Sequence, residues 1–474
     1  MKLLIVEDDE DNISLFETEL GASTTCKPTF ARSRESALTA LAAASFDMVV
    51  LDLKIPTKDG GLDSDVNHGL AVHSYVQENS YGTPIVVFSA YGTVKLAIKL
   101  AENSERNDTW GCGQEEPMTL YKEKSDFVEC LAHINRAIEH VDSLAKINLS
   151  TGGKVVNLTS EQKRVLRIYS RLHHGTNAMI SSLGGGLSNA KTVRLEVQDE
   201  HGATTTVALA KLGALKDLRD EETRYHQCIA PCLSVGGFAH LIKFLRAGAA
   251  NAGGIFYGFA GDYPQSLSDV LQANPAKACL TVGHLRRLEN DWHSNAVPKL
   301  ITVGEIRRSL VSDSDVDLFA GRLGFDWQTI ERMQINLKWC CQHRDLHCLN
   351  VLVRDDETPL LIDYGEVGRG PACLDPIILE LSLLFHPAFK DIRGTWPTAT
   401  QAQSWTDLDR YLSGCSIAAF VKACREWAFA VEPLDKGVYA TAYAFAVRQL
   451  KFTGTDHELA VSIARAAQAR LIAD

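Results

Sequence analysis

The sequence lacks an excess of basic residues. Among its 474 residues, 48 lysines and arginines stand against 59 aspartates and glutamates, which gives a formal net charge of -11 at pH 7. Nucleic acids and anionic membranes attract proteins mainly through clustered positive charge, so this balance argues against broad electrostatic capture of either. We therefore expect neither nucleic acid nor a membrane among the partners of this chain.

Long apolar runs are also absent. No uninterrupted apolar segment reaches the roughly 20 residues of a membrane-spanning helix. The opening MKLLIVEDDE places four acidic residues directly behind a very short apolar run. A secretory signal has a basic start and a longer apolar segment, so this opening differs from one. These features predict a cytoplasmic protein.

The twelve cysteines show no pairing or metal-binding pattern. Cys228 and Cys232 form a lone C-x-x-x-C, and Cys340, Cys341 and Cys348 lack a matching second half. A structural zinc site needs four ligands at set spacings, and disulfide frameworks are typical of small secreted domains. Buried, reduced thiols are the better interpretation.

A chain of 474 residues is too long for one core, so two or three domains are expected. Residues 1–145 alternate short apolar runs with segments of helical spacing. FDMVVLDL (46–53) and PIVVFSA (84–90) are near-continuous apolar runs, typical of strands buried on both faces. This rhythm predicts an α/β domain with a doubly wound parallel sheet of five strands.

Polar side chains follow the predicted strands of this sheet. They are Glu7 and Asp8 after the first strand, Asp52 after the third, Ser89 at the end of the fourth, and Lys122 or Lys124 near the end of the fifth. The carboxyl ends of parallel strands meet at one edge, where these carboxylates would repel unless a cation such as Mg²⁺ neutralised them. A hydroxyl and an ammonium opposite them suit a phosphoryl group. The alternative is that acidic residues simply end strands at solvent.

Residues 1 to about 145 resemble the receiver domain of response regulators. The resemblance implies that Asp52, in VVLDLKIP, accepts a phosphoryl group from a phosphohistidine of a sensor histidine kinase. It further implies that Glu7, Asp8 and Asp52 hold Mg²⁺ with the backbone carbonyl of Lys54. Ser89 would hydrogen-bond the new phosphoryl oxygen.

The lysine of the receiver family is open between Lys122 and Lys124. We choose Lys124, because receivers place a switch aromatic three residues earlier, where Tyr121 stands. The sequence departs from the usual receiver pattern in two places. They are the long loop 57–69 (TKDGGLDSDVNHG) and the enlarged connection 102–117 (ENSERNDTWGCGQEEP) before the fifth strand. We expect both to border the surface that changes on phosphorylation.

Residues 146–176 are expected to form a linker and a connecting helix. Segment 148–157 (NLSTGGKVVN) is rich in Gly, Ser and Thr. Segment 158–172 has helical spacing, with Thr159 or Ser160 as its N-cap. Two strands at 191–199 and 204–213, joined by the turn EHGA, are predicted next, and from about residue 265 the pattern is mostly helical.

A second polar cluster lies in CQHRDLHCLNVLV (341–353) and the following LLIDYG (360–365). Phosphoryl transfer from ATP needs a carboxylate for the acceptor hydroxyl, oxygen ligands for Mg²⁺ and a cation on the phosphates. Asp345, Asn350 and Asp363 offer the carboxylate and the oxygens. His343 and His347 have the i, i+4 spacing of zinc ligands, but the sequence that follows favours a β-hairpin over a helix.

From about residue 178 to the end, the chain resembles the aminoglycoside phosphotransferase and choline kinase branch of the protein-kinase-like fold. The signature is H-x-D-L-H-x-x-N with the downstream IDYG. The resemblance implies an α+β, two-lobed domain over residues 177–474, with a small lobe at about 177–262 and a large lobe at about 263–474. It implies ATP and Mg²⁺ as cofactors, Asp345 as the catalytic base, and Asn350 and Asp363 as metal ligands.

Upstream motifs follow in the order of that family. LGGGLSNAKTVRL resembles the glycine-rich loop, TTTVALAKLG the strand of the catalytic, phosphate-contacting lysine, and DEETRYHQ the helix of its glutamate partner. By this resemblance the nucleotide-binding residues are Gly184, Gly185, Gly186, Lys211, Glu221, Tyr257 and Ala260. Glu222 is the alternative to Glu221.

Together these motifs predict a two-component output protein whose receiver controls an ATP-dependent phosphotransferase. The short stretch between Asp363 and Asp375 leaves no room for a long peptide-docking segment, which favours a small-molecule hydroxyl or an unusual protein site as the acceptor. The expected partners are a sensor histidine kinase, ATP and this unknown acceptor, and a homodimer is compatible with the sequence.

Two other functions compete with this one. The carboxy-terminal half could be a pseudokinase that serves as a phosphorylation-regulated docking module. The chain could also be a transcription regulator, because segment 158–172 resembles the first helix of a DNA-binding domain. That idea lacks a basic recognition helix after this segment.

Overall fold

The computed structural model describes residues 1–21, 23, 25–90, 94–153, 155–182, 190–258 and 265–473. Gly184, Gly185, Gly186 and Ala260 therefore lie outside the described residues. The chain divides into two compact units, residues 1–219 with 241–259 and residues 220–240 with 260–474. Within the described ranges, no helix combines the length and the apolar character that crossing a membrane requires.

The first unit contains a parallel five-stranded sheet in the order β2-β1-β3-β4-β7. Its strands are β1 (Lys2–Val6), β2 (Lys27–Ala31), β3 (Met48–Leu51), β4 (Ile85–Ser89) and β7 (Thr119–Glu123). Every residue of β3 and β4 is buried, as their continuous apolar runs predict for strands covered on both faces. The predicted doubly wound sheet is confirmed.

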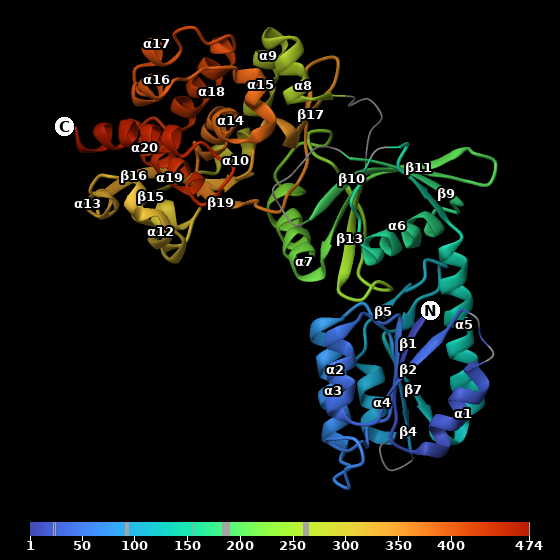
Figure 1. Ribbon diagram of the computed structural model, residues 1–474. Coiled ribbons are helices and arrows are strands. Elements are labelled where there is room, and N and C mark those ends of the chain that lie inside the picture. The colour runs from blue at the N-terminus through green and yellow to red at the C-terminus, as the bar shows by residue number, and fades with distance from the viewer. Residues whose placement is uncertain are drawn as a thin grey trace. The chain divides into compact units, whose positions relative to one another are not determined.

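Helices cover both faces of this sheet (Figure 1). On one face lie α1 (Glu10–Gly21) and α5 (Phe127–Ala145), and on the other α2 (Arg34–Ala43), α3 (Val66–Asn79) and α4 (Val94–Glu102). The ring of Phe16 on α1 packs edge-on against Phe88 on β4, with centroids 5.6 Å apart. Leu41, Val72 and Val76 fill the opposite face. The helices α1, α2, α3 and α5 bury apolar residues against the sheet, while Leu96 and Leu100 of α4 are only partly buried.

A six-stranded sheet in the order β12-β13-β11-β10-β9-β8 forms the rest of the first unit. Its strands are β8 (Asn148–Ser150), β9 (Asn177–Ser182), β10 (Lys191–Gln198), β11 (Thr204–Ala214), β12 (Leu241–Leu245) and β13 (Ala252–Gly258), and α7 (Leu215–Arg224) follows β11. The hairpin of β10 and β11 is confirmed. Strand β8 pairs in parallel with β9, so the segment predicted as a linker contributes an edge strand to the sheet.

The connecting helix α6 (Ser160–Leu172) begins where the sequence predicts. Thr159 caps it, accepting from the Gln162 backbone N–H at 3.2 Å while the Gln162 side chain accepts from the Thr159 N–H at 3.1 Å. This reciprocal pair satisfies two otherwise unbonded donors. Tyr169 of α6 stacks flat on Phe256 of β13, with ring centroids 3.7 Å apart, and so fixes the helix to the six-stranded sheet.

One continuous hydrophobic core joins one face of the parallel sheet to α6 and the six-stranded sheet, while a separate core fills the other face of the parallel sheet. The first of these cores includes Phe88 of the parallel sheet, Ile134 of α5, Leu166 of α6, Val193 of β10 and Phe256 of β13, all of them buried. Buried apolar area is the main source of folding free energy. The parallel sheet, α6 and the six-stranded sheet therefore stabilise one another.

The second unit combines helices with two small sheets. The sheets are β14 (Gln265–Ser266), β17 (Val351–Val353) and β18 (Pro359–Leu361), and β15 (Val297–Thr302), β16 (Gln334–Gln342) and β19 (Gly368–Pro371). The helices include α8 (Leu267–Ala273), α9 (Pro275–Leu288), α10 (Asn290–Ser294), α11 (Val303–Arg308), α12 (Asp313–Phe319), α13 (Trp327–Glu331), α14 (Leu374–Phe385), α15 (Lys390–Arg393), α16 (Ala399–Gln403), α17 (Leu408–Tyr411), α18 (Ala418–Val431), α19 (Asp435–Gln449) and α20 (His457–Ile472).

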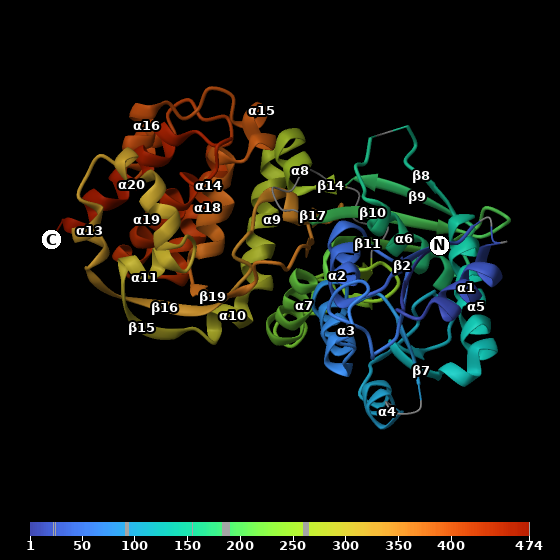
Figure 2. The same cartoon turned by 60° about the horizontal axis from the view of Figure 1, so that its bottom comes forward.

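The sheet of β15, β16 and β19 runs along one side of the helices, with α11 and α19 against it (Figure 2). The sequence predicts only helices and short β-like runs in this region, so this sheet is a correction. Strand β15 escapes prediction because it lies at an edge, carries Pro298 and is largely exposed, so it lacks the buried alternation of an internal strand. The prediction of an α+β organisation for this part of the chain is confirmed.

Candidate functional site

The first candidate site lies at the carboxyl edge of the parallel sheet. Val6 of β1 pairs with Leu51 of β3, and this register sets Glu7 beside Asp52. Carboxylate oxygens of Glu7, Asp8 and Asp52 all lie within 4.8 Å of one another. The structure thus brings together the three acidic residues predicted from the strand ends.

Lys124 contacts two of these carboxylates. Its Nζ lies 2.7 Å from Asp52 Oδ2 and 2.8 Å from Glu7 Oε2. Lys122 pairs instead with Glu129 on α5, 2.5 Å away. Of the two lysines that the sequence left open, Lys124 is therefore the one that faces the acidic residues.

The charges in this pocket shift each other's pKa. Burial raises the pKa of the Glu7 carboxyl, the Lys124 ammonium opposes this rise, and the negative charge of Asp52 adds to it. Burial alone would lower the pKa of Lys124, but the charges of Asp52 and Glu7 outweigh it and raise this pKa. Three carboxylates and one ammonium leave two negative charges, and an all-oxygen donor set of that charge fits Mg²⁺.

Asp52 is held in place by neutral donors as well. The Ser89 hydroxyl donates to Asp52 Oδ1 at 2.7 Å, and the Lys54 backbone N–H donates to the same oxygen at 3.2 Å. The long loop 57–69 reaches the pocket through Ser64, whose hydroxyl donates to Asp8 Oδ2 at 3.2 Å. This loop borders the acidic pocket, as the sequence predicts.

Tyr121 lies on β7, half-buried against the core formed with α2, α3 and α4. Within the described part of the chain its hydroxyl is buried without a hydrogen-bond partner. Burial raises the pKa of this phenol. An aromatic ring whose polar end is unsatisfied is suited to changing position when the pocket next to it changes.

The enlarged connection 102–117 lies at the edge of the sheet opposite to the acidic pocket, so it does not border that pocket as the loop 57–69 does. Its place beside a surface that changes on phosphorylation stays a prediction. The connection enters β7 at the amino end, whereas Lys124 follows the carboxyl end. It contains the short hairpin of β5 (Arg106–Asn107) and β6 (Glu116–Pro117). Between them Trp110 is buried, with its ring 6.3 Å from that of His140 on α5.

Glycines let this connection approach its neighbours closely. A Cβ on Gly111 would stand 2.5 Å from the Ile168 carbonyl oxygen of α6, and one on Gly248 would stand 2.2 Å from the Thr109 carbonyl oxygen. Both glycines have positive φ, at 68° and 87°. The connection therefore packs against α6 and the six-stranded sheet, where no larger residue could replace these glycines.

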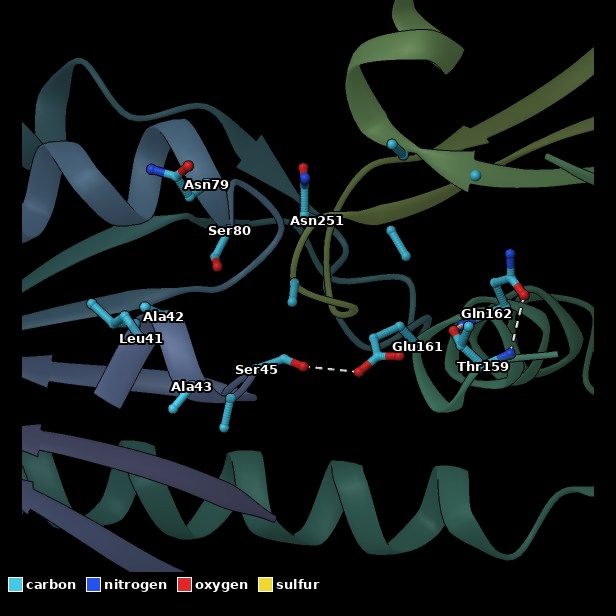
Figure 3. A pocket seen from close by; sticks show the side chains of 15 residues that line it. Leu41, Ala42, Ala43, Ser45, Asn79, Ser80, Thr159, Glu161, Gln162 and Asn251 are labelled. Carbon is cyan, nitrogen blue, oxygen red and sulfur yellow. Dashed lines mark hydrogen bonds between the residues drawn. The ribbon is translucent and has the colours of Figure 1, made fainter. Parts of the chain in front are cut away.

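Polar contacts join the same edge of the parallel sheet to α6. The Ser45 hydroxyl donates to Glu161 Oε1 at 2.8 Å (Figure 3). Arg164 Nη1 lies 3.3 Å from Asp47 Oδ1. Ser45 and Asp47 stand between α2 and β3, at the amino end of β3. The contacts are therefore made at the edge opposite to the acidic pocket.

Backbone hydrogen bonds add a second connection beside these contacts. The Gly82 N–H donates to the Ala250 carbonyl and the Gly248 N–H donates to the Gly82 carbonyl, both at 2.7 Å. A groove of about 500 Å³ lies between the two sets of contacts, lined by parts of α2, α6 and the segments 79–80 and 250–252 (Figure 3). No residue predicted for either site lines this groove.

Lys211 and Tyr257 lie on neighbouring strands of the six-stranded sheet. Lys211 on β11 pairs with Ile255 on β13, and Tyr257 pairs with Leu209. Both side chains are buried. Glu221 on α7 is part of the second unit and is buried there, whereas Glu222 is half-buried. Burying a lysine in a sheet is costly unless its charge is compensated, so Lys211 has to be paired where it lies.

The second candidate site follows β16 in the second unit. The backbone N–H groups of His343 and Arg344 donate to the two carboxylate oxygens of Asp375, at 2.6 and 2.7 Å. These bonds hold Arg344 in the left-handed region, at φ 65°. A non-glycine residue there costs free energy that the surrounding structure must supply, as is common at functional loops.

Sequence reasoning missed Asp375. It is fully buried in the first turn of α14, at the start of LDPIILELSLLF. The signal was available, because an aspartate in so apolar a helix needs hydrogen-bond partners to offset its burial. Burial raises the pKa of Asp375 to about 7, while the two N–H donors and the charge of Arg344 oppose this rise.

Asp345 and Asn350 are in direct contact. Asn350 Nδ2 donates to the Asp345 backbone oxygen at 2.8 Å and to Asp345 Oδ2 at 3.3 Å. The Asn350 carbonyl in turn accepts from the Ile362 N–H at 3.1 Å, which brings Asp363 close to this loop. Asp363 has φ 66°, and its Oδ1 accepts from the Gly365 N–H at 3.4 Å. The structure thus gathers the three predicted residues of this site.

Burial sets the protonation of this loop. It raises the pKa of Asp345 to about 6, which the positive charge of Arg448 opposes and the negative charge of Asp363 reinforces. It lowers the pKa of His347 to about 4 and lowers that of His343 as well. Both imidazoles are therefore neutral at pH 7, while Asp345 can gain and lose a proton close to neutrality.

The histidines have structural contacts. His343 Nε2 lies 3.0 Å from the Ile362 carbonyl oxygen, and the ring of His347 lies 5.1 Å from that of His386. Among the described residues, Glu7, Asp8 and Asp52 are the only carboxylate, imidazole or thiol ligands grouped closely enough for a metal ion. The two histidines thus do not form a zinc site with a third such ligand in the described ranges.

Comparisons with known proteins agree with the first site. Residues 3–106 match the family model of the response regulator receiver domain. Among solved structures, the chain is similar to the Francisella response regulator 1452 receiver domain, at 18% identity over 30% of this chain and 98% of that one, with a TM-score of 0.22. It is also similar to a signal receiver domain from Pseudomonas fluorescens Pf-5, at 21% identity over 30% and 89%, with a TM-score of 0.22. The predicted receiver domain is confirmed.

One solved structure covers a larger part of the chain. It is a Ralstonia eutropha JMP134 protein assigned as an aminoglycoside phosphotransferase, similar at 11% identity over 62% of this chain and 92% of that one, with a TM-score of 0.36. A comparison with curated proteins gives no significant match. The receiver domain supports a role in two-component signalling, and the chemistry of the second site has to be argued from its own residues.

Proposed function

We propose that this chain is a two-component output protein in which phosphorylation of Asp52 by a sensor histidine kinase regulates an ATP-dependent phosphotransferase. The receiver would span residues 1–145, the connecting segment 146–176, and the phosphotransferase 177–474 with lobes meeting near residue 262. The acceptor would be a hydroxyl group of a small molecule or of an unusual protein site.

At the receiver, Asp52 supplies the nucleophile. One of its carboxylate oxygens forms a bond to phosphorus as the bond from phosphorus to the donor imidazole breaks, and the imidazole keeps the electron pair. Lys124, already 2.7 Å from Asp52, then pairs with the new phosphoryl group, and the Ser89 hydroxyl turns from the carboxylate to a phosphoryl oxygen. When bound by Glu7, Asp8 and Asp52, Mg²⁺ would supply neutralisation of the phosphoryl oxygens.

In the second unit, Asp345 would accept the proton of the acceptor hydroxyl while that oxygen forms its bond to the γ-phosphorus of ATP. The bond from this phosphorus to the oxygen that bridges the β- and γ-phosphates would break, and ADP would leave with the electron pair. A pKa of about 6 leaves Asp345 ionised at pH 7, yet basic enough to take a proton. Asn350 holds the carboxylate in place through Nδ2. Asp363 and the oxygen of Asn350 would hold Mg²⁺, whose role when bound is to neutralise the phosphates of ATP.

Lys211 would pair with the phosphates of ATP, with Glu221 as its partner. The glycines at 184–186, Tyr257 and Ala260 would bind the nucleotide. A buried lysine is a suitable phosphate ligand, because a low-dielectric setting strengthens its attraction for an anion. These assignments rest on the resemblance and on the burial of Lys211 and Tyr257.

Coupling between the two halves would pass through α6. This helix shares a core with the receiver and with the six-stranded sheet that carries Lys211, and it contacts the receiver through Glu161 and Arg164. A change in the receiver therefore has a continuous packed route to the sheet.

The observation that carries the enzymatic part of the proposal is the Asp345 loop, with its carboxylate of near-neutral pKa fixed by Asn350 and by the bonds of the loop to Asp375. The test is transfer of labelled phosphate from ATP to candidate metabolites and to lysate proteins, with and without receiver phosphorylation. We expect Asp345→Asn and Lys211→Met to abolish transfer to an acceptor that the wild type labels. Transfer that continues unchanged in both variants would contradict the assignment, and a wild type that binds ATP but labels nothing would favour the pseudokinase.

A further inference from the structure

The second unit contains a pocket that none of the predicted site residues lines. Its volume is about 420 Å³, and it lies between the loop 234–237, the carboxy-terminal part of α9 and the turn that joins β17 to β18. Small-molecule sites in proteins have volumes of roughly 300–1,000 Å³. The pocket is therefore large enough for a small ligand.

Backbone contacts fix the shape of this pocket. The Gly237 carbonyl accepts from the Leu361 N–H of β18 at 2.9 Å, so the loop 234–237 is bonded to the strand that follows the turn. A Cβ on Gly237 would stand 2.1 Å from a methyl carbon of Leu288, so the backbone of this loop lies directly on α9. The three walls are thus held together before any ligand binds.

The lining of the pocket is basic. Arg287, Arg354 and His284 contribute to it, and none of its ten lining residues is acidic. Arg287 and His284 lie on α9, which contains no Asp or Glu, whereas the whole chain has a formal net charge of -11. Among the described residues, no ion pair engages Arg287. Its guanidinium is therefore available to an anion in the pocket.

The turn between β17 and β18 contains three acidic residues after Arg354, but none of them lines the pocket. The Asp355 side chain is fully exposed, and Asp356 Oδ1 accepts from the Thr358 N–H at 3.1 Å. Hydrogen bonds from Thr358 lower the pKa of Asp356, and the charge of Arg354 adds to this effect. Asp356 thus offsets part of the Arg354 charge, which makes Arg287 the principal cation of the pocket.

These groups suit a phosphate that carries an apolar group. Guanidinium groups bind oxyanions through paired N–H donors, and an imidazole can donate a further N–H. A phosphate monoester has a charge of about -1.5 to -2 at pH 7, which matches two arginines better than the single charge of a carboxylate. Val235, Leu288 and Pro359 line the apolar part of the pocket, and Val235 is 85% exposed. Contact with an apolar group would remove this valine from water.

We propose that this pocket binds a small phosphate monoester. Arg287, Arg354 and His284 hold its phosphate, and its organic group lies against Val235 and Leu288. The pocket shares no lining residue with the Asp345 site. The binding therefore does not depend on the phosphotransferase activity proposed above.

Hydrogen bonds connect the pocket to the Asp345 site through β18. The Ala239 N–H donates to the Leu361 carbonyl at 3.2 Å and to the Tyr364 hydroxyl at 2.7 Å. Tyr364 directly follows Asp363, the predicted metal ligand. A ligand that ties the loop 234–237 to the turn makes these bonds open less often, so it should slow amide exchange in the segment 359–364.

The test is isothermal titration of the full chain with phenyl phosphate in a buffer without phosphate. We expect saturable binding that Arg287→Gln and Arg354→Gln each weaken roughly tenfold or more, because each removes a charge-assisted contact. Arg286→Gln is the matched control, since this exposed neighbour on α9 does not line the pocket, and it should bind like the wild type. Val235→Asp adds a repelling charge at an exposed position, so it should weaken binding in a chain whose circular dichroism is unchanged.

Other probes separate the sources of the phosphate. Inorganic phosphate, which lacks an apolar group, should bind roughly tenfold more weakly than phenyl phosphate, and benzoate, which has a ring but one charge, should also bind more weakly. Lys211→Met should leave the binding unchanged, because Lys211 lies outside the pocket.

Hydrogen exchange locates the bound probe. Phenyl phosphate should slow exchange in the segments 234–239 and 359–364 of the wild type and of Arg286→Gln, but not of Arg287→Gln. The proposal is overturned if phenyl phosphate shows no saturable binding, or if its binding survives Arg287→Gln. Equal affinity for inorganic phosphate or benzoate would overturn it too, as would a phosphopeptide that binds the pocket when phenyl phosphate does not.

Discussion

At the carboxyl edge of the receiver sheet, Asp52 touches a lysine, a serine and a backbone N–H, whereas in the second unit Asp345 faces an asparagine amide and a neutral histidine. The first carboxylate has a full positive charge 2.7 Å away. Within the described ranges no ion pair places a positive charge that close to the second carboxylate, and burial raises its pKa to about 6. The two carboxylates therefore lie in different electrostatic settings, which suits the different roles that we propose for them.

The largest effect is expected at Asp52, because the proposed chemistry of the receiver depends on this one carboxylate. Asp52→Asn removes the only nucleophile proposed for the receiver, so labelling by an acyl phosphate such as acetyl phosphate should fall to background. The measurement is the mass gain of one phosphoryl group on the intact chain. Asp9→Asn is the matched control, since this residue is acidic and adjacent in sequence to Asp8 but is not part of the three-carboxylate group. Labelling that survives in Asp52→Asn would place the acceptor elsewhere.

Asp375 tests whether the second site depends on its buried support. Asp375→Ala leaves the N–H groups of His343 and Arg344 without acceptors, at about 1–3 kcal/mol each, so the unfolding free energy of the second unit should drop by about 2–6 kcal/mol. The substitution also removes the cost of burying the Asp375 carboxylate, so the loss of unfolding free energy should lie toward the low end of this range. Urea titration of the full chain and amide exchange at residues 343 and 344 measure the change.

Asp375→Asn is the control for that substitution. It keeps one acceptor oxygen and the side-chain volume, so it should lose less stability than Asp375→Ala. Unchanged protection of both amides in Asp375→Ala would show that the loop is held by other contacts.

The pH dependence of transfer sharpens the difference between the two carboxylates. Asp345 is a base only when ionised, so with a pKa of about 6 the rate should be level above that pH and fall about tenfold for each pH unit below it. Turnover of ATP with a saturating acceptor, measured from about pH 5 to pH 8, shows this fall in rate. If the residual activity of Asp345→Asn shows the same fall in rate at low pH, the group that titrates is not Asp345.

The smallest effect is expected at the opposite edge of the receiver. Arg164→Met removes the ion pair with Asp47 but keeps the apolar part of the side chain, so stability should change by only about 0.2–1 kcal/mol. Phosphorylation of Asp52 should be unaffected, while the response of transfer to that phosphorylation should weaken. Lys58→Met, which removes a more exposed ion pair with Glu35, is the control. An unchanged response would remove this contact from the proposed route.

Much of the receiver fold, and the grouping of its acidic residues, could be predicted from the sequence by simple rules. Buried strands show as continuous apolar runs, and parallel strands bring their carboxyl ends to one edge, so the grouping of Glu7, Asp8 and Asp52 could be predicted. The choice of Lys124 over Lys122 rested on resemblance, and only the structure shows that Lys122 pairs with Glu129. The contacts of the connection 102–117 with α5 and α6 could not be predicted, because its sequence says nothing about the partners it packs against.

The second unit was harder to predict because its important contacts join residues far apart in the chain. Asp345, Asn350 and Asp363 could be found, since they sit in one short motif. Asp375 could not be assigned to the N–H groups of His343 and Arg344, which lie more than thirty residues earlier in the chain. Strand β15 was missed because an exposed edge strand with a proline lacks the period of a buried one.

The continuous core of the first unit also limits how this protein can be cut and recombined. Cutting the chain after residue 145 would strip the receiver of Phe256 and of the buried face of α6, and the remainder of the chain would lose the packing of α5 in return. A receiver from another protein, grafted at the same point, would lack Trp110 and the close glycine contact at Gly111. The receiver and the six-stranded sheet therefore depend on each other for part of their buried surface, so a foreign receiver would need matching residues at this contact.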